Sequence, residues 1–151
     1  MKVLVTGATG GLGELVISKL LSQNIEVIAT SRNEEKAKQC DFFSKVTYIP
    51  FDINSKNNSD LYSYFNKPDA LIHLAWEKLD EYKNEAHTSS ILENHKQFLS
   101  NLIDKGLKDI TVVGTCYEYG LHEGILKENM TSKPVLPYPQ GKNLFCFQKF
   151  A

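Results

Sequence analysis

The sequence predicts a doubly wound α/β fold with a parallel β-sheet. Short apolar, β-branched segments alternate with segments of helical periodicity from residue 2 to residue 114. A glycine-rich turn at residues 6–13 joins the first of these strands to the first helix. The segment 70–75 is almost wholly apolar, as a parallel strand buried on both faces should be. Together these observations indicate successive βα units around one sheet.

Five strands are expected. They are placed where β-branched and apolar residues cluster, at 2–5, 25–30, 46–49, 70–75 and 110–114.

The helices follow from 3.6-residue periodicity and capping residues. Leu12, Leu15, Val16, Leu20 and Leu21 predict an amphipathic helix after the glycine turn. Further helices are expected at 33–40 with Asn33 as N-cap, at 61–65 capped by Ser59 or Asp60, and at 91–103 closed by Gly106. After a long loop at 121–137, a final helix has Pro139 in its first position and runs towards Ala151.

The glycine turn Thr6-Gly7-Ala8-Thr9-Gly10-Gly11-Leu12-Gly13 predicts a binding site for the pyrophosphate of a dinucleotide. Backbone N–H groups of the turn and the positive end of the following helix dipole point at the same place. The spacing Gly7-x-x-Gly10-x-x-Gly13 allows a tight turn, a close approach of the ligand and close helix–strand packing. The alternative is an ordinary β–α turn. The expected contacts are Gly7, Thr9, Gly10, Gly11, Leu12 and Gly13.

The end of the second strand bears on the choice of dinucleotide. An NAD site usually has an acidic residue there, which accepts hydrogen bonds from the adenosine ribose. This chain has Ser31 and Arg32, which can bind a 2′-phosphate that a carboxylate would repel. NADP(H) is therefore the preferred prediction and NAD(H) is possible, since Arg32 could instead be a solvated arginine at a helix start.

Two other strand ends are candidates for cofactor contacts. Asp52 follows the third strand and could accept a hydrogen bond from the adenine amino group, or could be an ordinary turn residue. Leu74, Ala75 and Trp76 end the fourth strand, and we expect them beside the glycine turn. The small side chain of Ala75 would leave room for a ligand.

Tyr138, Lys142 and Thr115 predict proton-transfer chemistry. Tyr138 and Lys142 are four residues apart and so share one helix face, and Thr115 follows the fifth strand. A free phenol has a pKa of about 10. A nearby ammonium group and a positively charged nicotinamide ring should lower that pKa, which would let Tyr138 exchange a proton with a sugar oxygen. Thr115 would orient the same oxygen.

In these motifs, the chain resembles the extended short-chain dehydrogenase/reductases, the NAD(P)-dependent nucleotide-sugar epimerase/dehydratase/reductase family. The resemblance covers all 151 residues and implies an NAD(P)-binding Rossmann fold. The glycine turn matches the family's TGxxGxxG motif, and Thr115, Tyr138 and Lys142 match its catalytic residues, of which Tyr138 and Lys142 also bind cofactor. Its other cofactor-site motifs match Asp52-Ile53, Leu71-Ile72-His73-Leu74-Ala75 and Asn94.

Within the family, Gly114–Gly120 is most similar to reductases of dTDP-4-keto-6-deoxyhexoses. Dehydratases of the family have Asp-Glu where this chain has Cys116 and Tyr117, so dehydration is not expected. The resemblance therefore implies NADP-dependent reduction of a nucleotide-linked 4-keto sugar, with Tyr138 as proton donor or acceptor. A 4-epimerase with bound NAD, or a non-catalytic NADP-binding module or fragment, is the alternative. Gly141 replaces the family's usual Ser or Ala.

Length and composition set further expectations. The 151 residues carry a net charge of −1, which gives no reason to expect a nucleic acid or an anionic membrane as partner. We expect one Rossmann domain, 1–151, truncated before the substrate domain that the family resemblance implies. The resemblance also implies a homodimer. Scattered Cys40, Cys116 and Cys146 fit reduced thiols in the cytoplasm, and the four histidines have no metal-ligand spacing.

Overall fold

The computed structural model describes residues 1–55, 60–127 and 129–146. The chain packs as two compact units. The first comprises Met1–Ala75 and Phe98–Val112, and the second comprises Trp76–Gln97 and the described residues from Val113 onward.

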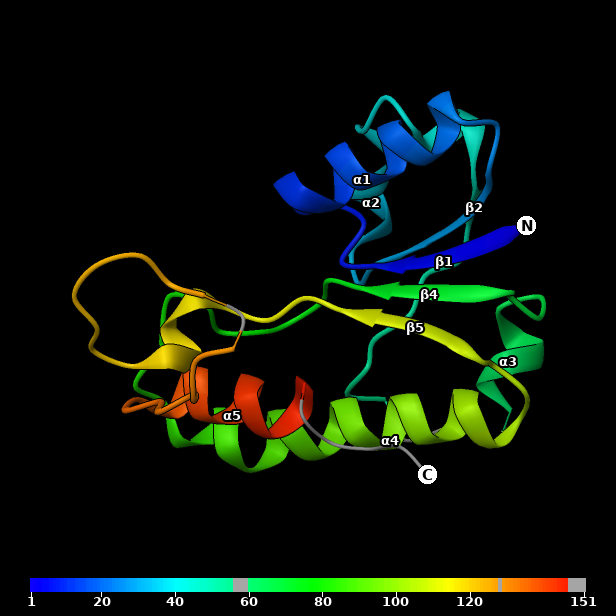
Figure 1. The fold of residues 1–151 in the computed structure, drawn as a ribbon. Coiled ribbons are helices and arrows are strands. Elements are labelled where there is room, and N and C mark those ends of the chain that lie inside the picture. Colours follow the sequence, from blue (N-terminus) through cyan, green and yellow to red (C-terminus); the bar gives the residue numbers. More distant parts are fainter. Residues whose placement is uncertain (56–59, 128, 147–151) are drawn as a thin grey trace. The chain divides into compact units, whose positions relative to one another are not determined.

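A five-stranded parallel sheet forms the centre of the first unit, as predicted (Figure 1). Its strand order is β3-β2-β1-β4-β5. The strands are β1 (Lys2–Thr6), β2 (Glu26–Thr30), β3 (Thr47–Tyr48), β4 (Ala70–His73) and β5 (Asp109–Val112). In register, Leu4 of β1 lies between Ile28 of β2 and Leu71 of β4. The carboxyl ends of these parallel strands therefore share one edge of the sheet.

Three strands end earlier than predicted, at Tyr48, His73 and Val112. At the end of β4 the cause is visible, because the amides of Leu74 and Ala75 both donate to the hydroxyl of Thr6. A side chain thus takes over from the backbone ladder at this point. Apolar sequence alone does not reveal such a change.

The helices of the first unit lie on both faces of the sheet (Figure 1). α1 (Gly11–Ser22) and α2 (Glu34–Lys38) lie on one face, and α3 (Leu61–Tyr64) with the later part of α4 (Ser90–Asp104) lies on the other. A short 3₁₀ helix, η1 (Phe43–Lys45), precedes β3. The side chain of Asn33 caps α2 and that of Asp60 caps α3, as predicted, whereas Ser59 lies outside the described residues.

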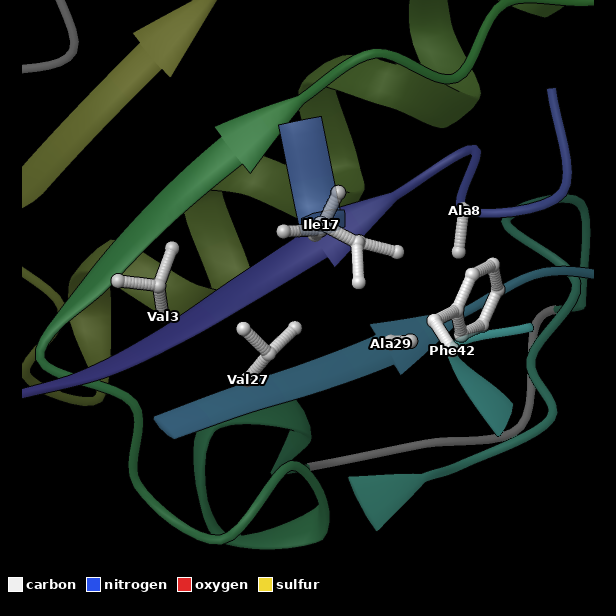
Figure 2. Packing of buried hydrophobic residues seen from close by; sticks show 7 residues of the cluster. Val3, Ala8, Ile17, Val27, Ala29 and Phe42 are labelled. Atoms are coloured by element: carbon white, nitrogen blue, oxygen red, sulfur yellow. The ribbon is translucent and has the colours of Figure 1, made fainter. Parts of the chain in front are cut away.

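The face under α1 is an apolar core (Figure 2). Alternate residues of β1 and β2 point into it, since side chains alternate between the faces of a strand. They pack with Ala8, Ile17 and Phe42. The predicted apolar face of α1 is partly wrong, because Leu12 is 50% and Leu15 70% exposed. Gly13 and Ile17 form the buried stripe instead, since a helix with a glycine at its contact can approach the sheet closely.

The opposite face is closed by aromatic residues. His73 stacks on Phe98 with ring centroids 5.6 Å apart, and Phe51 packs against both Phe65 and Phe98. The amide of Leu61 donates to the Asn101 side chain, which ties α3 to α4. The apolar face predicted for α4 is confirmed, because Phe98, Leu99 and Leu102 are buried.

The second unit contains two 3₁₀ helices, η2 (Glu85–Thr88) and η3 (Cys116–Tyr119), together with α5 (Pro137–Cys146). α5 begins at Pro137, two residues before the predicted start, so Tyr138 lies inside its first turn. Residues 121–127 and 129–136 form no helix or strand, which confirms the predicted loop. The prediction that the last helix runs towards Ala151 lies outside the described residues beyond Cys146.

Candidate active site

The glycine turn is built by close backbone approaches within the first unit. Gly7 has a φ of +69°, and a Cβ added to it would lie 2.9 Å from the backbone nitrogen of Ala75. A Cβ on Gly13 would overlap the carbonyl oxygen of Gly7 and lie 2.7 Å from that of Ala8. The amide of Gly10 donates to the Gly7 carbonyl at 3.0 Å. Gly7 and Gly13 are therefore required by the packing of the turn itself.

The start of α1 has the properties of an anion site. Gly10 is the N-cap residue and no side chain caps the helix. Gly10, Gly11 and Leu12 are exposed, so the first-turn amides, which lack acceptors within the helix, lie at an open surface. Thr9, half-buried, precedes them. These residues fit the pyrophosphate of a dinucleotide, which binds uncapped helix starts.

Thr6 joins the end of β4 to this turn. Its hydroxyl oxygen accepts hydrogen bonds from the amides of Leu74 and Ala75, at 3.2 and 3.3 Å. With its lone pairs engaged, the hydroxyl donates its own hydrogen to Nδ1 of buried His73, 2.9 Å away. The structure thus places Leu74 and Ala75 against Gly7, as predicted.

The end of β2 presents Ser31 and Arg32. The phenol of Tyr48 donates to the Ser31 carbonyl at 3.1 Å, and the Ser31 hydroxyl lies 2.9 Å from the same phenol. Arg32 is exposed. The serine hydroxyl is therefore already engaged with Tyr48, and Arg32 carries the positive charge at this strand end.

Asp52 is a turn residue in this structure. Its Oδ1 accepts hydrogen bonds from the backbone and side-chain nitrogens of Asn54, both at 3.0 Å. The second interpretation given for Asp52 is therefore the one observed, while its contact with adenine stays a prediction. Ile53 beside it is half-buried, and Asn94 is half-buried on α4.

Thr115, Tyr138 and Lys142 all belong to the second unit. Thr115 is the N-cap of η3, and Tyr138 and Lys142 lie one turn apart on α5, as predicted. The side chain of Thr115 lies close enough to the Tyr138 phenol to hold down the pKa of that phenol. The backbone amide of Tyr138 donates to the Tyr82 carbonyl at 3.0 Å, which fixes the first turn of α5. The chain thus brings a hydroxyl and a phenol to one point, with a buried lysine on the same helix.

The protonation of Tyr138 differs from the prediction. Burial raises the pKa of Tyr138 above its usual value, the hydrogen bond from Thr115 opposes this rise, and the negative charge of Glu118 adds to it. The expected lowering of this pKa by Lys142 is therefore not found, while the lowering by a bound, positively charged nicotinamide ring stays a prediction. Burial lowers the pKa of Lys142 itself. The phenol is consequently in its protonated form at neutral pH.

Trp76 holds Lys142 in place. The Lys142 Nζ lies 4.5 Å from the centre of the Trp76 ring, a cation–π contact. The indole N–H of Trp76 donates to Nδ1 of buried His87 at 3.0 Å, so the ring proton of His87 lies on Nε2, which is 3.2 Å from the Glu81 carbonyl. These observed partners of Trp76 are side chains of its own unit, and its contact with a cofactor stays a prediction.

Two buried polar side chains near these residues were not predicted from the sequence. His95 packs on Trp76, and its Nε2 lies 2.8 Å from a carboxylate oxygen of Glu77. Glu118 is only 8% exposed and accepts a hydrogen bond from the Thr115 amide at 2.8 Å. The spacing Thr115-x-x-Glu118 is that of a capping box, which could have predicted the second interaction.

A cavity of about 550 Å³ lies beside Tyr138 in the second unit. Its lining is largely apolar and includes Leu79, Leu136, Tyr82 and Tyr117. Across the described ranges, no cluster of three or more potential metal-binding side chains occurs. The described helices include none with the length and apolar character needed to span a membrane.

Gly141, which departs from the family pattern, has a structural reason. A Cβ at this position would overlap the carbonyl oxygen of His87 in η2. We expect Gly141→Ala to lower the free energy of unfolding by about 1–3 kcal/mol, because the backbone of η2 must move. Thermal unfolding would measure this, with Leu144→Ala on the exposed side of α5 as control. An unchanged melting temperature in both variants would contradict the expectation.

Comparisons with known proteins extend these observations. The model of the NAD dependent epimerase/dehydratase family matches residues 3–145. A dTDP-6-deoxy-L-talose 4-dehydrogenase (NAD(+)) from Aggregatibacter actinomycetemcomitans is 29% identical over 143 residues, which are 95% of this chain and 52% of that protein. The chain thus spans about half the length of this relative.

Two solved structures have a similar fold. A UDP-glucose-4-epimerase from Stenotrophomonas maltophila, with bound NAD and formylated UDP-arabinopyranose, has a TM-score of 0.79 and 18% identity over 95% of this chain and 46% of its own. A UDP-glucuronic acid 4-epimerase from Bacillus cereus, in complex with UDP-glucuronic acid and NAD, has a TM-score of 0.75 and 22% identity over 95% of this chain and 49% of its own. With the family model matching nearly the whole chain, the protein belongs to the NAD dependent epimerase/dehydratase family.

Proposed function

We propose that the protein is an oxidoreductase that reduces a nucleotide-linked 4-keto-6-deoxyhexose with a nicotinamide dinucleotide. The observation that carries this proposal is the arrangement of three side chains in the second unit: Thr115 acts on the Tyr138 phenol, and buried Lys142 lies one turn further along α5. The glycine turn and the uncapped start of α1 would hold the pyrophosphate. The dinucleotide, when bound, supplies the hydride.

Tyr138 acts as the proton donor in this proposal. Its raised pKa keeps the phenol protonated at neutral pH, so it can deliver a proton to the substrate carbonyl oxygen. Thr115, which already acts on the phenol, would orient the same oxygen. The ammonium group of Lys142 would stabilise the phenolate that remains after proton transfer. The largely apolar cavity beside Tyr138 suits a sugar that lacks a hydroxyl group at its sixth carbon.

Epimerisation is the second candidate, because the two similar solved structures are named as 4-epimerases. The curated relative is named as a 4-dehydrogenase, which favours net oxidation or reduction. Cys116 and Tyr117 lack the carboxylates needed to eliminate water. A purely cofactor-binding role is disfavoured by the intact catalytic residues.

The test uses the natural protein that carries this chain, supplied with a dTDP-4-keto-6-deoxyhexose and either NADH or NADPH. Loss of reduced-nicotinamide absorbance in proportion to sugar consumed is the expected result. Interconversion of a UDP- or dTDP-sugar with no net change in nicotinamide, together with NAD that co-purifies, would replace reduction by epimerisation. A homodimer in the cytoplasm is the further part of this proposal, to be checked by native mass measurement and fractionation.

Cofactor preference is a separate point. Arg32 is exposed at the end of β2, and no carboxylate accompanies it at residues 31–32, which favours a 2′-phosphate. The relatives described above are named with NAD and lend no support to NADP.

We expect Arg32→Ala to weaken NADPH binding on the order of tenfold, because one charge-assisted hydrogen bond to the phosphate is lost. NADH binding should not change. Nicotinamide fluorescence titration measures both affinities, and Lys36→Ala, which removes an exposed charge from α2, is the control. Equal affinities of wild type and Arg32→Ala for NADPH would assign the site to NAD.

A further inference from the structure

We propose that Glu118 is a positioning residue of the site. It fixes the Thr115 backbone so that the Thr115 hydroxyl lies beside the Tyr138 phenol, and its carboxylate places a negative charge that acts on Lys142. The proposal rests on the proposed function, since it concerns the same Thr115, Tyr138 and Lys142. Neither the family motif nor the names of the relatives assign a role to this carboxylate.

The first support is the hydrogen bonding at the start of η3. The Thr115 amide donates to Oε1 of Glu118 at 2.8 Å, while the Thr115 hydroxyl accepts from the Tyr117 amide at 3.4 Å. Both halves of a capping box are thus present. A capping box usually stabilises an exposed helix start, but η3 has four residues and Glu118 is 8% exposed. Burying a carboxylate costs free energy, and the stability of one short turn is too small a gain to offset that cost. We therefore relate the burial of Glu118 to its contact with Thr115.

The surrounding backbone is shaped to admit the carboxylate. A Cβ on Gly114 would lie 2.7 Å from Oε1 of Glu118, so the residue before Thr115 must be glycine for the carboxylate to occupy this position. The Glu118 carbonyl accepts from the Lys133 amide at 2.9 Å. Gly120, with a φ of +75°, approaches Lys133 too closely for any side chain. Glu118 is therefore held by Gly114 on the side of its carboxylate and by Lys133 on the side of its backbone.

Charged and titratable groups from two elements face Glu118. These are Tyr138, Lys142 and Cys146 of α5 and the Thr115 amide at the start of η3. Burial raises the pKa of Glu118, and the backbone hydrogen bond from Thr115 and the charge of Lys142 oppose that rise. In return, the carboxylate adds to the rise in the pKa of Tyr138 and opposes the fall in the pKa of Lys142 that burial causes. Both effects favour the protonated phenol and the charged ammonium, the forms that proton donation requires.

The experiment compares Glu118→Gln and Glu118→Leu in the natural protein, with Glu123→Gln as an exposed control in the same unit. Glutamine keeps an oxygen that accepts from the Thr115 amide but removes the charge, and leucine removes both. Phenolate absorbance is followed against pH, and the same titration of Tyr138→Phe is subtracted to isolate Tyr138. The rate constant kcat for sugar reduction is measured over the same pH range.

We expect Tyr138 to titrate at a lower pH in Glu118→Gln than in wild type, and to be unchanged in Glu123→Gln. Glu118→Leu should lower kcat on the order of a hundredfold through misplacement of Thr115, and Glu118→Gln should recover most of that loss. An unshifted Tyr138 titration in Glu118→Gln, or a wild-type kcat in Glu118→Leu, would overturn the proposal. Should the wild-type protein reduce no nucleotide sugar, the proposed function fails, and the Tyr138 titration alone still decides the part played by Glu118.

Discussion

Tyr138→Phe is expected to lower kcat for sugar reduction by roughly 10²–10⁴-fold, the usual contribution of a positioned proton donor. Phenylalanine keeps the ring but removes the hydroxyl on which Thr115 acts. The substrate oxygen would then have no acid from which to take a proton. Dinucleotide affinity should change far less than kcat, because the pyrophosphate site at the glycine turn is untouched.

The pH dependence of the wild-type enzyme provides a second readout of the same group. The pKa of Tyr138 is raised above its ordinary value, mainly by burial. The phenol therefore stays protonated through the neutral range, and kcat for reduction should remain level there. It should fall only in alkaline solution, as Tyr138 loses its proton.

Tyr62→Phe, on α3, serves as the control for the loss of one phenol. Stopped assays with purified variants at saturating NADPH or NADH would measure kcat, and circular dichroism would verify folding. Activity of Tyr138→Phe equal to that of Tyr62→Phe would remove Tyr138 from the proton-transfer step and with it the proposed mechanism.

The order of the elements could be predicted because parallel strands and amphipathic helices have different hydrophobic periods. The β2 segment and α4 followed this rule closely, at Glu26–Thr30 and Ser90–Asp104. The end of β4 could not be predicted, because there the hydroxyl of Thr6 replaces backbone partners for the amides of Leu74 and Ala75. The exposure of Leu12 and Leu15 could not be predicted either, because the residues of α1 that contact the sheet are Gly13 and Ile17.

The candidate site was predictable where residue spacing carried the information. Tyr138 and Lys142 share α5 because they are four residues apart. The partners of Lys142 were not predictable, because Trp76 is 66 positions away along the chain and reaches it only through tertiary packing. The raised pKa of Tyr138 was not predictable either, because burial and the charge of Glu118, which raise it, also depend on tertiary packing.

Gly10→Val is expected to weaken dinucleotide binding by about a hundredfold or more, because each hydrogen bond from an amide to a charged phosphate contributes about 1.5–3 kcal/mol. Gly10 is exposed at the uncapped start of α1, where the ligand must approach the backbone closely. Its φ of −85° and ψ of 158° are extended values that valine adopts without strain. A Cβ there would have only the Gly7 carbonyl oxygen nearby, at 3.3 Å. The chain should therefore fold and fail to bind.

Two neighbouring glycines separate binding from folding in this experiment. A Cβ on Gly11 meets no atom within 4 Å, so Gly11→Val should preserve stability and leave binding much less affected than Gly10→Val. A Cβ on Gly13 overlaps the Gly7 carbonyl, so even Gly13→Ala should destabilise the first unit, by about 1–3 kcal/mol. Titration with NADH and NADPH beside thermal unfolding distinguishes the three. Wild-type affinity in Gly10→Val would mean that the phosphates do not bind at the start of α1, because this substitution leaves the rest of the turn intact.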